Sequence, residues 1–259
     1  NPAIRAAVMR AADYGDEVIG FRQGWKGVIE NDTLPLALAA VEDLIQVGGT
    51  MLESSRTNPL KKQEDLDACL ASIKAQALDA LIAMGGEDTL GVANELSRVD
   101  VPVVGVPKTM DNDINHTDFT FGFDSAVAVA VDAADRLRDT ARSHRRCMVL
   151  EVMGRHAGWV ALHTAVAGGA DWVLLPEVAP DFDEMYAHLD SLRQRGKNYA
   201  LVVVSEGTEI PEIESETITR DSFGRAILKE RGVGDFVAAQ VEEHTGFKET
   251  RVSVLGHII

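Results

Sequence analysis

The chain of 259 residues is 46% hydrophobic, so it can bury the core of one large α/β domain or of two smaller lobes. Its formal net charge of −16 repels polyanions and argues against nucleic acid or an anionic membrane as the main partner. The two cysteines, Cys69 and Cys147, form no CxxC motif, and no apolar run approaches the length of a membrane span, which predicts a cytoplasmic protein.

Short apolar runs alternate along the chain with segments of helical periodicity. We expect the runs to form buried parallel strands at 79–84, 101–106, 147–152, 171–175, 199–204 and 251–255. The clearest helical pattern covers 124–144, where Val127, Ala134 and Leu137 share one face. This order predicts a doubly wound α/β fold, in which ligands bind beyond the carboxyl ends of the strands. The acidic stretch 209–220 lacks either periodicity and is expected to be a surface loop.

The loop at 85–89, Gly-Gly-Glu-Asp-Thr, leads from a predicted strand into a predicted helix. Paired glycines such as Gly86 let the backbone approach a phosphate, and the N–H groups at a helix start favour an anion. The adjacent carboxylates of Glu87 and Asp88 suit such a site chiefly when Mg²⁺ is present. An ordinary Gly-Gly turn followed by acidic residues at a helix start explains this segment equally well.

The loop at 107–114, Pro-Lys-Thr-Met-Asp-Asn-Asp-Ile, also follows directly after a predicted strand. Transfer of a phosphoryl group to a hydroxyl needs a carboxylate that takes the proton and a cation that neutralises the developing charge. Asp111, Asp113 and Lys108 provide these groups. An Asx-rich turn is the alternative. It accounts for Asn112 and one aspartate, but not for the lysine and the second aspartate.

Two further loops follow predicted strands. In the segment 151–159, glycines flank Arg155 and His156, and an arginine at a strand-to-helix turn can hold a phosphate through two hydrogen bonds. We interpret His156 as a packed or surface histidine. Glu206 follows another predicted strand and by itself is a weak indication of a site. The basic run 143–146 is most simply interpreted as a cationic helix end.

Taken together, these segments resemble the phosphofructokinase family, and in particular its pyrophosphate-dependent, actinobacterial-like members. The matching motifs occur in the family's order over nearly the whole chain, at 85–89, 107–113, 117–123, 135–140, 151–158 and 254–257. The resemblance implies two similar Rossmann-like lobes with the active site in the cleft between them. Residues 1–122 with 245–259 would form the donor-phosphate lobe, and 123–244 the fructose 6-phosphate lobe. It also implies a homodimer or homotetramer, in which Arg146 matches the residue that reaches a neighbouring subunit's sugar-phosphate site.

The implied reaction is the Mg²⁺-dependent phosphorylation of the C1 hydroxyl of fructose 6-phosphate to fructose 1,6-bisphosphate, a step of glycolysis. In the loop 107–114, Asp111 matches the family's catalytic base, Thr109 lies beside the substrate, and Lys108 neutralises charge. Asp113 and Glu87 fall near the substrate and the metal ion, with Glu87 in place of the commoner aspartate. The residues that match sugar-phosphate contacts within one subunit are Met153, Gly154, Arg155 and Glu206.

The identity of the phosphoryl donor depends on Asp88 and Lys108. ATP-using relatives usually carry glycine at both positions, which leaves room for the α-phosphate and ribose of the nucleotide. Pyrophosphate-using relatives carry aspartate and lysine, as this chain does. We therefore expect pyrophosphate as the donor, held by Gly86 and Arg56 as well. ATP is the alternative donor, in which case Asp88 only stabilises a helix start and Lys108 is solvated.

Both ends of the chain depart from the family pattern. The family's glycine-rich G-G-x-x-P-G loop would precede Asn1, and its Gln-Arg-Gly-Gly motif would follow near Ile259. We therefore expect this 259-residue segment to be inactive by itself. A subunit or fragment that binds sugar phosphate without turnover is a competing hypothesis, although Asp111 is intact. A NAD or lipid kinase would share the Gly-Gly-acid turn, but the Met-Gly-Arg segment at 153–155 disfavours it.

Overall fold

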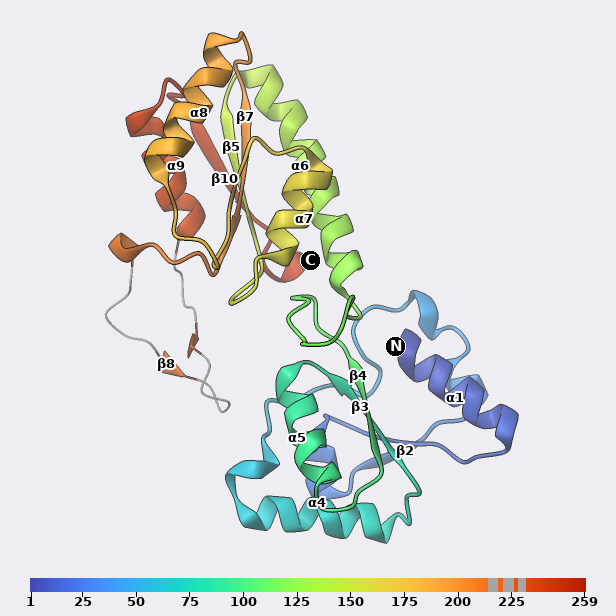
Figure 1. Cartoon of the computed structure of the whole chain (residues 1–259). Coiled ribbons are helices and arrows are strands. Elements are labelled where there is room, and N and C mark those ends of the chain that lie inside the picture. Colours follow the sequence, from blue (N-terminus) through green and yellow to red (C-terminus); the bar gives the residue numbers. More distant parts are fainter. Residues whose placement is uncertain (214–218, 221–225, 228–231) are drawn as a thin grey trace. The chain divides into compact units, whose positions relative to one another are not determined.

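The computed structural model describes residues 1–213, 219–220, 226–227 and 232–259 (Figure 1). The chain divides into two compact units. Unit 1 comprises Asn1–Pro107 and Arg220–Ala226, and unit 2 comprises Lys108–Thr219 and Ile227–Ile259. Two short strands, β8 (Thr219–Arg220) and β9 (Ala226–Ile227), pair with each other. Within the described ranges, no helix is long and apolar enough to cross a membrane.

Unit 1 contains a strand–helix–strand motif in which β3 (Leu81–Gly85) and β4 (Val103–Pro107) are parallel and α5 (Glu87–Ser97) connects them. Two buried side chains of α5, Val92 and Leu96, belong to the same core cluster as Ala83 of β3. Because successive side chains of a strand point to opposite faces, this core covers one face of the pair. Ile82 and Val104, on β3 and β4, remain 47% and 61% exposed.

Several further elements of unit 1 precede β3. The strands β1 (Ile19–Phe21) and β2 (Thr33–Pro35) pair in the antiparallel sense. The helices of this part, including three-residue 3₁₀ turns, are α1 (Pro2–Tyr14), α2 (Trp25–Glu30), α3 (Leu38–Val41), η1 (Leu44–Gln46), η2 (Pro59–Lys61) and α4 (Gln63–Ala75). The helix α2 packs against α4, and both contribute to the core beneath β3.

Unit 2 contains a four-stranded parallel sheet with the order β10-β5-β7-β6. Its strands are β5 (Cys147–Val152), β6 (Trp172–Leu174), β7 (Ala200–Ser205) and β10 (Thr250–Val254). Its helices and 3₁₀ turns are α6 (Phe123–His144), α7 (Trp159–Gly168), α8 (Phe182–Gln194), η3 (Pro211–Ile213), α9 (Val233–His244) and η4 (Gly256–Ile258). Every residue of β7 is buried.

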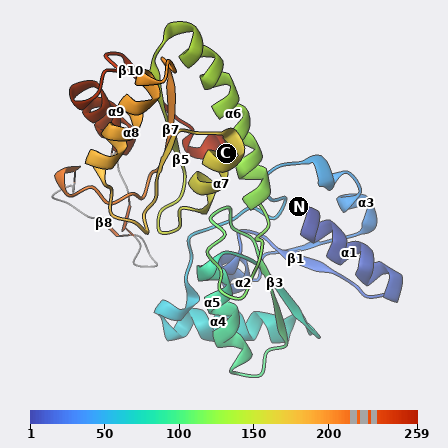
Figure 2. The same ribbon diagram turned by 45° about the horizontal axis from the view of Figure 1, so that its top comes forward.

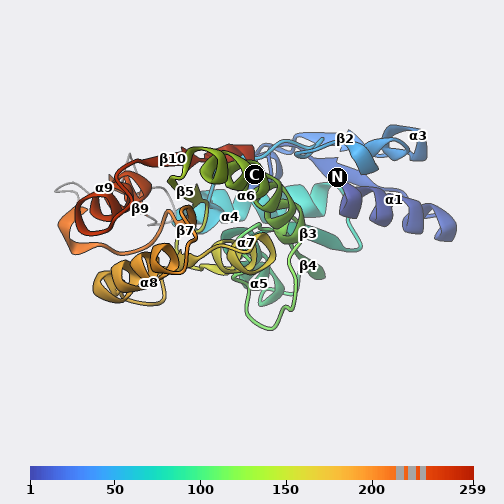
Figure 3. The same ribbon diagram turned by 90° about the horizontal axis from the view of Figure 1, so that it is seen from above.

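Helices cover both faces of this sheet, α6 and α7 on one side and α8 and α9 on the other (Figure 2). Alternate residues of β5 point into the two cores: Leu150 faces α6 and α7, whereas Val149 faces α8 and α9. The helices α6 and α7 also pack directly against each other (Figure 3). Unit 2 is therefore a doubly wound layer structure, which confirms the α/β prediction.

The predicted strands appear within two residues of their expected ends, and the helix predicted over 124–144 is α6. The expectation of buried strands is correct for β5 and β7. It is wrong for β3, β6 and β10, which keep exposed or partly exposed residues, and for β4, all of whose residues keep some exposure. For β3 and β4, the reason is that α5 packs on only one face of the pair. In the predicted surface loop 209–220, Ile210 is buried, and 214–218 lie outside the described residues.

The boundaries of the units differ from the predicted lobes in three places, one of which is the range Arg220–Ala226 that belongs to unit 1. Residues 245–259 belong to unit 2, because β10 pairs with β5 along its length, from Thr250 opposite Cys147 to Val254 opposite Glu151. Residues 108–122 also belong to unit 2, because Met110 packs against the core cluster that contains Phe123. The assignment of donor phosphate to one lobe and sugar phosphate to the other stays a prediction.

Candidate functional site

Two loops meet at the carboxyl edge of the unit 2 sheet, where β5 and β7 end side by side. The Glu206 N–H donates to the Val152 carbonyl over 2.9 Å, and the Gly207 N–H donates to the Gly154 carbonyl over 3.0 Å. The Ser205 hydroxyl donates to the same Gly154 carbonyl over 2.5 Å. The structure therefore brings Glu206 together with the predicted sugar-phosphate residues at 153–155.

Glycines allow this close approach. Gly154 has a φ of 144°, which only glycine adopts without strain. A Cβ atom on Gly207 would lie 2.0 Å from the Arg155 carbonyl oxygen, so no other residue fits at this position. The sequence indicated the loop through Glu206 alone. The roles of Ser205 and Gly207 were missed, although both stand directly beside that glutamate after a strand.

At this edge, backbone N–H groups at the starts of two helices donate hydrogen bonds to carboxylates of the protein itself. Glu177 accepts a hydrogen bond from the Gly158 N–H at the start of α7 over 2.8 Å. Glu151 accepts one from the Gly234 N–H at the start of α9 over 2.7 Å. These two helix starts are already paired with negative charge, so an anion bound here would depend on cationic side chains such as Arg155.

Glu151 is also the charged residue of the otherwise apolar strand β5. Burial raises its pKa, and the nearby carboxylates of Glu206 and Asp235 raise it further, while the hydrogen bond from Gly234 opposes the shift. Glu206 thus shares this edge with two further acidic groups. A group of carboxylates favours ligands whose hydroxyl groups donate hydrogen bonds, or ligands that bind together with a cation.

The loop 108–122 is folded by its own polar contacts. The Thr120 hydroxyl donates to the Thr109 carbonyl over 2.5 Å, and the Thr120 N–H donates to the Asn112 side-chain oxygen over 2.9 Å. The Asp111 N–H donates to the Thr109 hydroxyl over 3.2 Å. Asn112 has a left-handed φ of 54°, which asparagine tolerates. Its side-chain oxygen accepts from a residue eight positions further on rather than two, so the contact is not an Asx turn.

The chemically important side chains of this loop differ in exposure. Asp111 and Thr109 are partly buried, whereas Lys108 and Asp113 are exposed. A partly buried carboxylate next to a threonine hydroxyl suits a proton acceptor for a substrate alcohol. The structure thus keeps Asp111 and Thr109 together, and it places Lys108 and Asp113 at the surface of the same loop.

In unit 1, the Gly86, Glu87 and Asp88 loop forms the start of α5. Gly86 is the N-cap residue, and the two carboxylates occupy the first turn of the helix. Within the part of the chain that the structure describes, three or more side chains suited to metal binding do not cluster anywhere. Mg²⁺ nonetheless commonly takes only one or two carboxylates from a protein when substrate phosphates supply the other oxygens. Glu87, in the first turn of α5, therefore fits such an ion.

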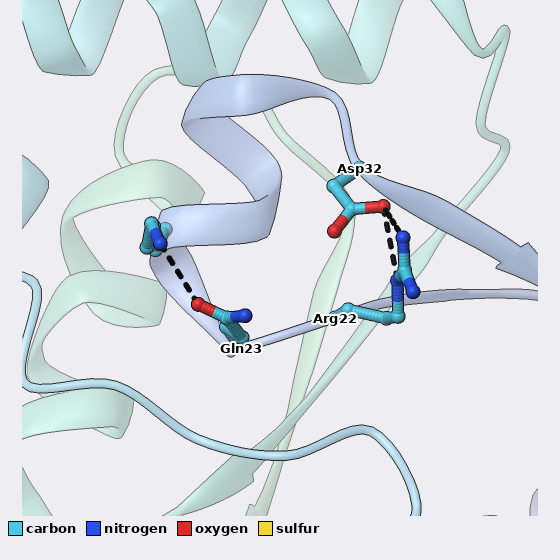
Figure 4. Close-up of polar contacts among 4 residues, drawn as sticks. Arg22, Gln23 and Asp32 are labelled. Atoms are coloured by element: carbon cyan, nitrogen blue, oxygen red, sulfur yellow. Dashed lines mark hydrogen bonds and ion pairs between the residues drawn. The ribbon is translucent and has the colours of Figure 1, made fainter.

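Arg56 lies on an exposed segment of unit 1 that is attached to the turn after β1. The Ser55 hydroxyl donates to the Gln23 carbonyl over 2.7 Å. The turn is held by Arg22, whose guanidinium donates to Asp32 over 2.5 and 3.0 Å, and by a hydrogen bond from Lys26 to the Gln23 side chain (Figure 4). This arrangement fixes the backbone immediately before Arg56.

Arg146 lies away from the other predicted sugar-phosphate residues of unit 2. It immediately precedes β5, whereas Met153 immediately follows this strand of six residues. At about 3.3 Å per residue, the two ends of β5 are roughly 20 Å apart. The Arg146 guanidinium pairs with Glu249 over 2.5 Å. One chain therefore does not bring Arg146 to the site at 153–155.

Comparison with known proteins identifies the family of the chain. The phosphofructokinase family model matches residues 1–259. The chain is 52% identical over 261 residues to the pyrophosphate--fructose 6-phosphate 1-phosphotransferase of Dictyoglomus thermophilum, and the match covers 100% of this chain and 75% of that protein. It is 46% identical over 262 residues to the ATP-dependent 6-phosphofructokinase 3 of Streptomyces coelicolor, covering 100% of this chain and 76% of that protein.

Solved structures show the same likeness. The phosphofructokinase from Saccharomyces cerevisiae has a TM-score of 0.82 at 27% identity, covering 99% of this chain and 36% of that longer chain. The pyrophosphate-dependent phosphofructokinase from Nitrosospira multiformis has a TM-score of 0.80 at 25% identity, covering 98% of this chain and 65% of that one. With the family model matched from end to end, the chain belongs to the phosphofructokinase family.

Proposed function

We propose that the protein transfers a phosphoryl group from pyrophosphate to the C1 hydroxyl of fructose 6-phosphate, giving fructose 1,6-bisphosphate and phosphate, as a step of glycolysis. The observation that carries this proposal is the hydrogen-bonded junction of the 153–155 and 205–207 loops. It joins the backbones of the loops that carry Arg155 and Glu206 at the carboxyl edge of a parallel sheet, where ligands of doubly wound folds bind. The names of the relatives support the same reaction.

In this proposal the loop 108–113 performs the chemistry on the acceptor. The C1 oxygen attacks the terminal phosphorus of pyrophosphate, its proton passes to the Asp111 carboxylate, and the bond to the bridging oxygen breaks so that phosphate leaves. Thr109 orients the hydroxyl, and its partly buried position beside Asp111 supports this role. Lys108 compensates charge on the transferred group, and Asp113 assists near the substrate.

The sugar phosphate is bound by groups of different chemistry. Arg155 offers a planar pair of donors to the 6-phosphate, and Glu206 accepts hydrogen bonds from sugar hydroxyls. Met153 and Gly154 complete the surface against which the sugar lies. Arg146 is proposed to act on the site of a neighbouring subunit in a homodimer or homotetramer. Its place at the opposite end of β5 from Met153 supports this assignment.

The donor is proposed to bind at the start of α5 in unit 1. Phosphofructokinases generally use a divalent metal ion, and we propose Mg²⁺ held by Glu87, which would neutralise charge on the pyrophosphate oxygens. Gly86 lets the backbone approach the phosphates, and Arg56 adds a cation. Asp88 selects against ATP, because a carboxylate about 4 Å from an α-phosphate opposes it by roughly 4 kcal/mol at an effective dielectric constant near 20.

The proposed location is the cytoplasm. Cys69 and Cys147 are both buried free thiols, and burial raises the pKa of each to about 12, with a nearby aspartate adding to the shift. Unpaired buried thiols of this kind are typical of proteins from reducing compartments. They are also too weakly ionised to act as nucleophiles.

The test is to assay the full-length protein with fructose 6-phosphate and either pyrophosphate or ATP. We expect turnover with pyrophosphate to exceed turnover with ATP. No turnover with either donor would refute the proposed reaction, and a preference for ATP would refute the donor assignment.

Asp88→Gly sharpens this test, since it removes the opposing charge and leaves space for the nucleotide. We expect kcat/KM for ATP to rise at least about tenfold, which corresponds to about 1.4 kcal/mol. The matched control is Asp79→Gly, the same change before β3 rather than after it, which should leave donor preference unchanged. A glycine variant at 88 without any gain in ATP use would remove the stated reason for the preference.

A further inference from the structure

Ser205 is the last residue of β7, and it is fully buried, with 0% of its surface exposed. A buried hydroxyl is costly unless it forms a hydrogen bond. The Ser205 hydroxyl donates to the Gly154 carbonyl over 2.5 Å, and the Gly207 N–H donates to the same oxygen over 3.0 Å. One carbonyl oxygen, located between Met153 and Arg155, thus receives two donors from the loop that carries Glu206.

The two loops are packed so closely that neither Gly154 nor Gly207 leaves room for a side chain. A Cβ atom on Gly154 would lie 2.8 Å from the Ser205 hydroxyl oxygen and 2.7 Å from the Ala157 carbonyl oxygen. A Cβ atom on Gly207 would lie 2.0 Å from the Arg155 carbonyl oxygen. The backbone beside Glu206 therefore touches the backbone of Arg155, and the orientation of the Gly154 peptide sets where the Arg155 side chain begins.

We propose that Ser205 is a positioning residue for sugar-phosphate binding, because its hydroxyl fixes the Gly154 peptide and so sets Arg155 relative to Glu206. This inference rests on the proposed function of those two residues. Being fully buried, Ser205 does not touch the substrate itself. Its contribution comes from holding the two binding groups in one geometry before the ligand arrives. The competing explanation is that Ser205 only stabilises the fold.

Kinetics of Ser205→Ala separate these explanations. We expect KM for fructose 6-phosphate to rise about fivefold or more, the equivalent of one lost hydrogen bond, while KM for pyrophosphate stays unchanged. Ser191→Ala is the matched control, because the Ser191 hydroxyl on α8 also donates to a backbone carbonyl, that of His188, over 2.7 Å. The control should lower neither affinity. An unchanged KM for fructose 6-phosphate in Ser205→Ala, or equal changes for both substrates, would overturn the proposal.

A second measurement does not depend on activity. Amide hydrogen exchange reports how firmly the Gly207 N–H is held against Gly154, and we expect it to accelerate about fivefold or more in Ser205→Ala but not in Ser191→Ala. Unaltered exchange at Gly207 would overturn the positioning role even in an active enzyme. If the wild-type protein has no turnover, the proposed function fails, and the exchange data still decide whether Ser205 holds the junction.

Ser205→Cys extends both measurements if the alanine variant does not fold. The thiol nearly preserves the size of the side chain but is only a weak donor. It should therefore give the same selective rise in KM for fructose 6-phosphate and the same faster exchange at Gly207. A cysteine variant that matches the wild-type protein in both would contradict the proposal.

Discussion

The two parallel sheets of this chain differ in how their faces are covered. In unit 2, helices pack on both faces, and Leu150 in the middle of β5 is fully buried. In unit 1, the core cluster under α5 lies on one face of β3 and β4. On the other face Met84 packs against a second cluster, but Ile82 and Val104 are 47% and 61% exposed. The strands have similar apolar sequences, so an apolar run predicts the strand itself but not what covers it.

This difference matters for function, because binding residues keep a defined geometry only when the strands and helices that support them are firmly packed. The junction of the 153–155 and 205–207 loops extends from the two strands of unit 2 that are buried on both faces. The Gly86 to Asp88 loop extends from β3, one face of which leaves Ile82 47% exposed, although Met84 on that same face packs against a core cluster. We therefore expect the sugar-phosphate loops to be more firmly held than the donor loop.

The largest expected effect comes from truncating matched apolar residues in the two sheets of the 259-residue chain. Leu150→Ala leaves a cavity between β5 and the α6–α7 pair and should lower the free energy of unfolding by about 2–5 kcal/mol. Ile82→Ala removes a side chain that is about half exposed and should cost less than about 1 kcal/mol. Urea denaturation, with midpoints and slopes compared, measures both changes.

Equal losses in the free energy of unfolding for the two variants would contradict the difference in burial between the two sheets. A large loss for Ile82→Ala would mean that the exposed face of β3 is covered in solution, for example by a second molecule. Dilution of the protein would reveal that case, because stability gained from association depends on concentration.

The outline of the fold could be predicted from the sequence because apolar runs and helical periodicity are local signals. The start of α6 follows Gly122, whose φ of 108° lies in the region that glycine favours, and the predicted helix began one residue later than the observed Phe123. The packing face of α6 was predicted only in part. Its buried side chains include Ala126, Ala130 and Ala141. Alanine is small and occurs on buried and exposed helix faces alike, so these residues do not mark the packing face in the sequence.

The unit boundaries and the positioning residues could not be predicted from local patterns. The pairing of β10 with β5 joins segments about a hundred residues apart, so 245–259 was placed in the other lobe. The role of Ser205 depends on the hydrogen bond from its hydroxyl to Gly154, a contact across 51 residues of sequence. The predicted roles of Asp111, Thr109 and Arg155 rest on the family resemblance and stay predictions.

The next largest effect concerns the loop 108–122, which belongs to unit 2. Asp111→Asn keeps the size of the side chain but cannot accept a proton, so kcat should fall on the order of a hundredfold or more in the full-length enzyme. KM for fructose 6-phosphate should change little, because the amide preserves packing. Steady-state kinetics with pyrophosphate test this expectation. Asp118→Asn, an exposed position in the same loop, is the control and should retain normal turnover.

A variant at Asp111 that keeps more than half of the wild-type kcat would exclude this residue as the base. A matching loss in Asp118→Asn would instead point to a general disturbance of the loop. Either result would weaken the view that unit 2 carries both the acceptor chemistry and the sugar-phosphate contacts.

The smallest effect is a pH dependence that arises because the unit 2 sheet is covered on both faces. Burial raises the pKa of Glu151, and Glu206 and Asp235 add to the shift, while the Gly234 N–H opposes it. The folded protein therefore binds this proton more tightly than the unfolded chain, in which glutamate has a pKa of about 4.3. Stability from this group is complete below that pH and is lost as the pH rises through the folded-state pKa.

Glu151→Gln does not titrate and can still accept the Gly234 hydrogen bond, so the wild-type Tm should fall relative to that of the variant as the pH increases from about 4. Thermal unfolding across this range measures the difference, and the exposed Glu17→Gln should show no comparable trend. A wild-type Tm that instead rises relative to that of Glu151→Gln would show that the hydrogen bond to ionised Glu151 outweighs its burial.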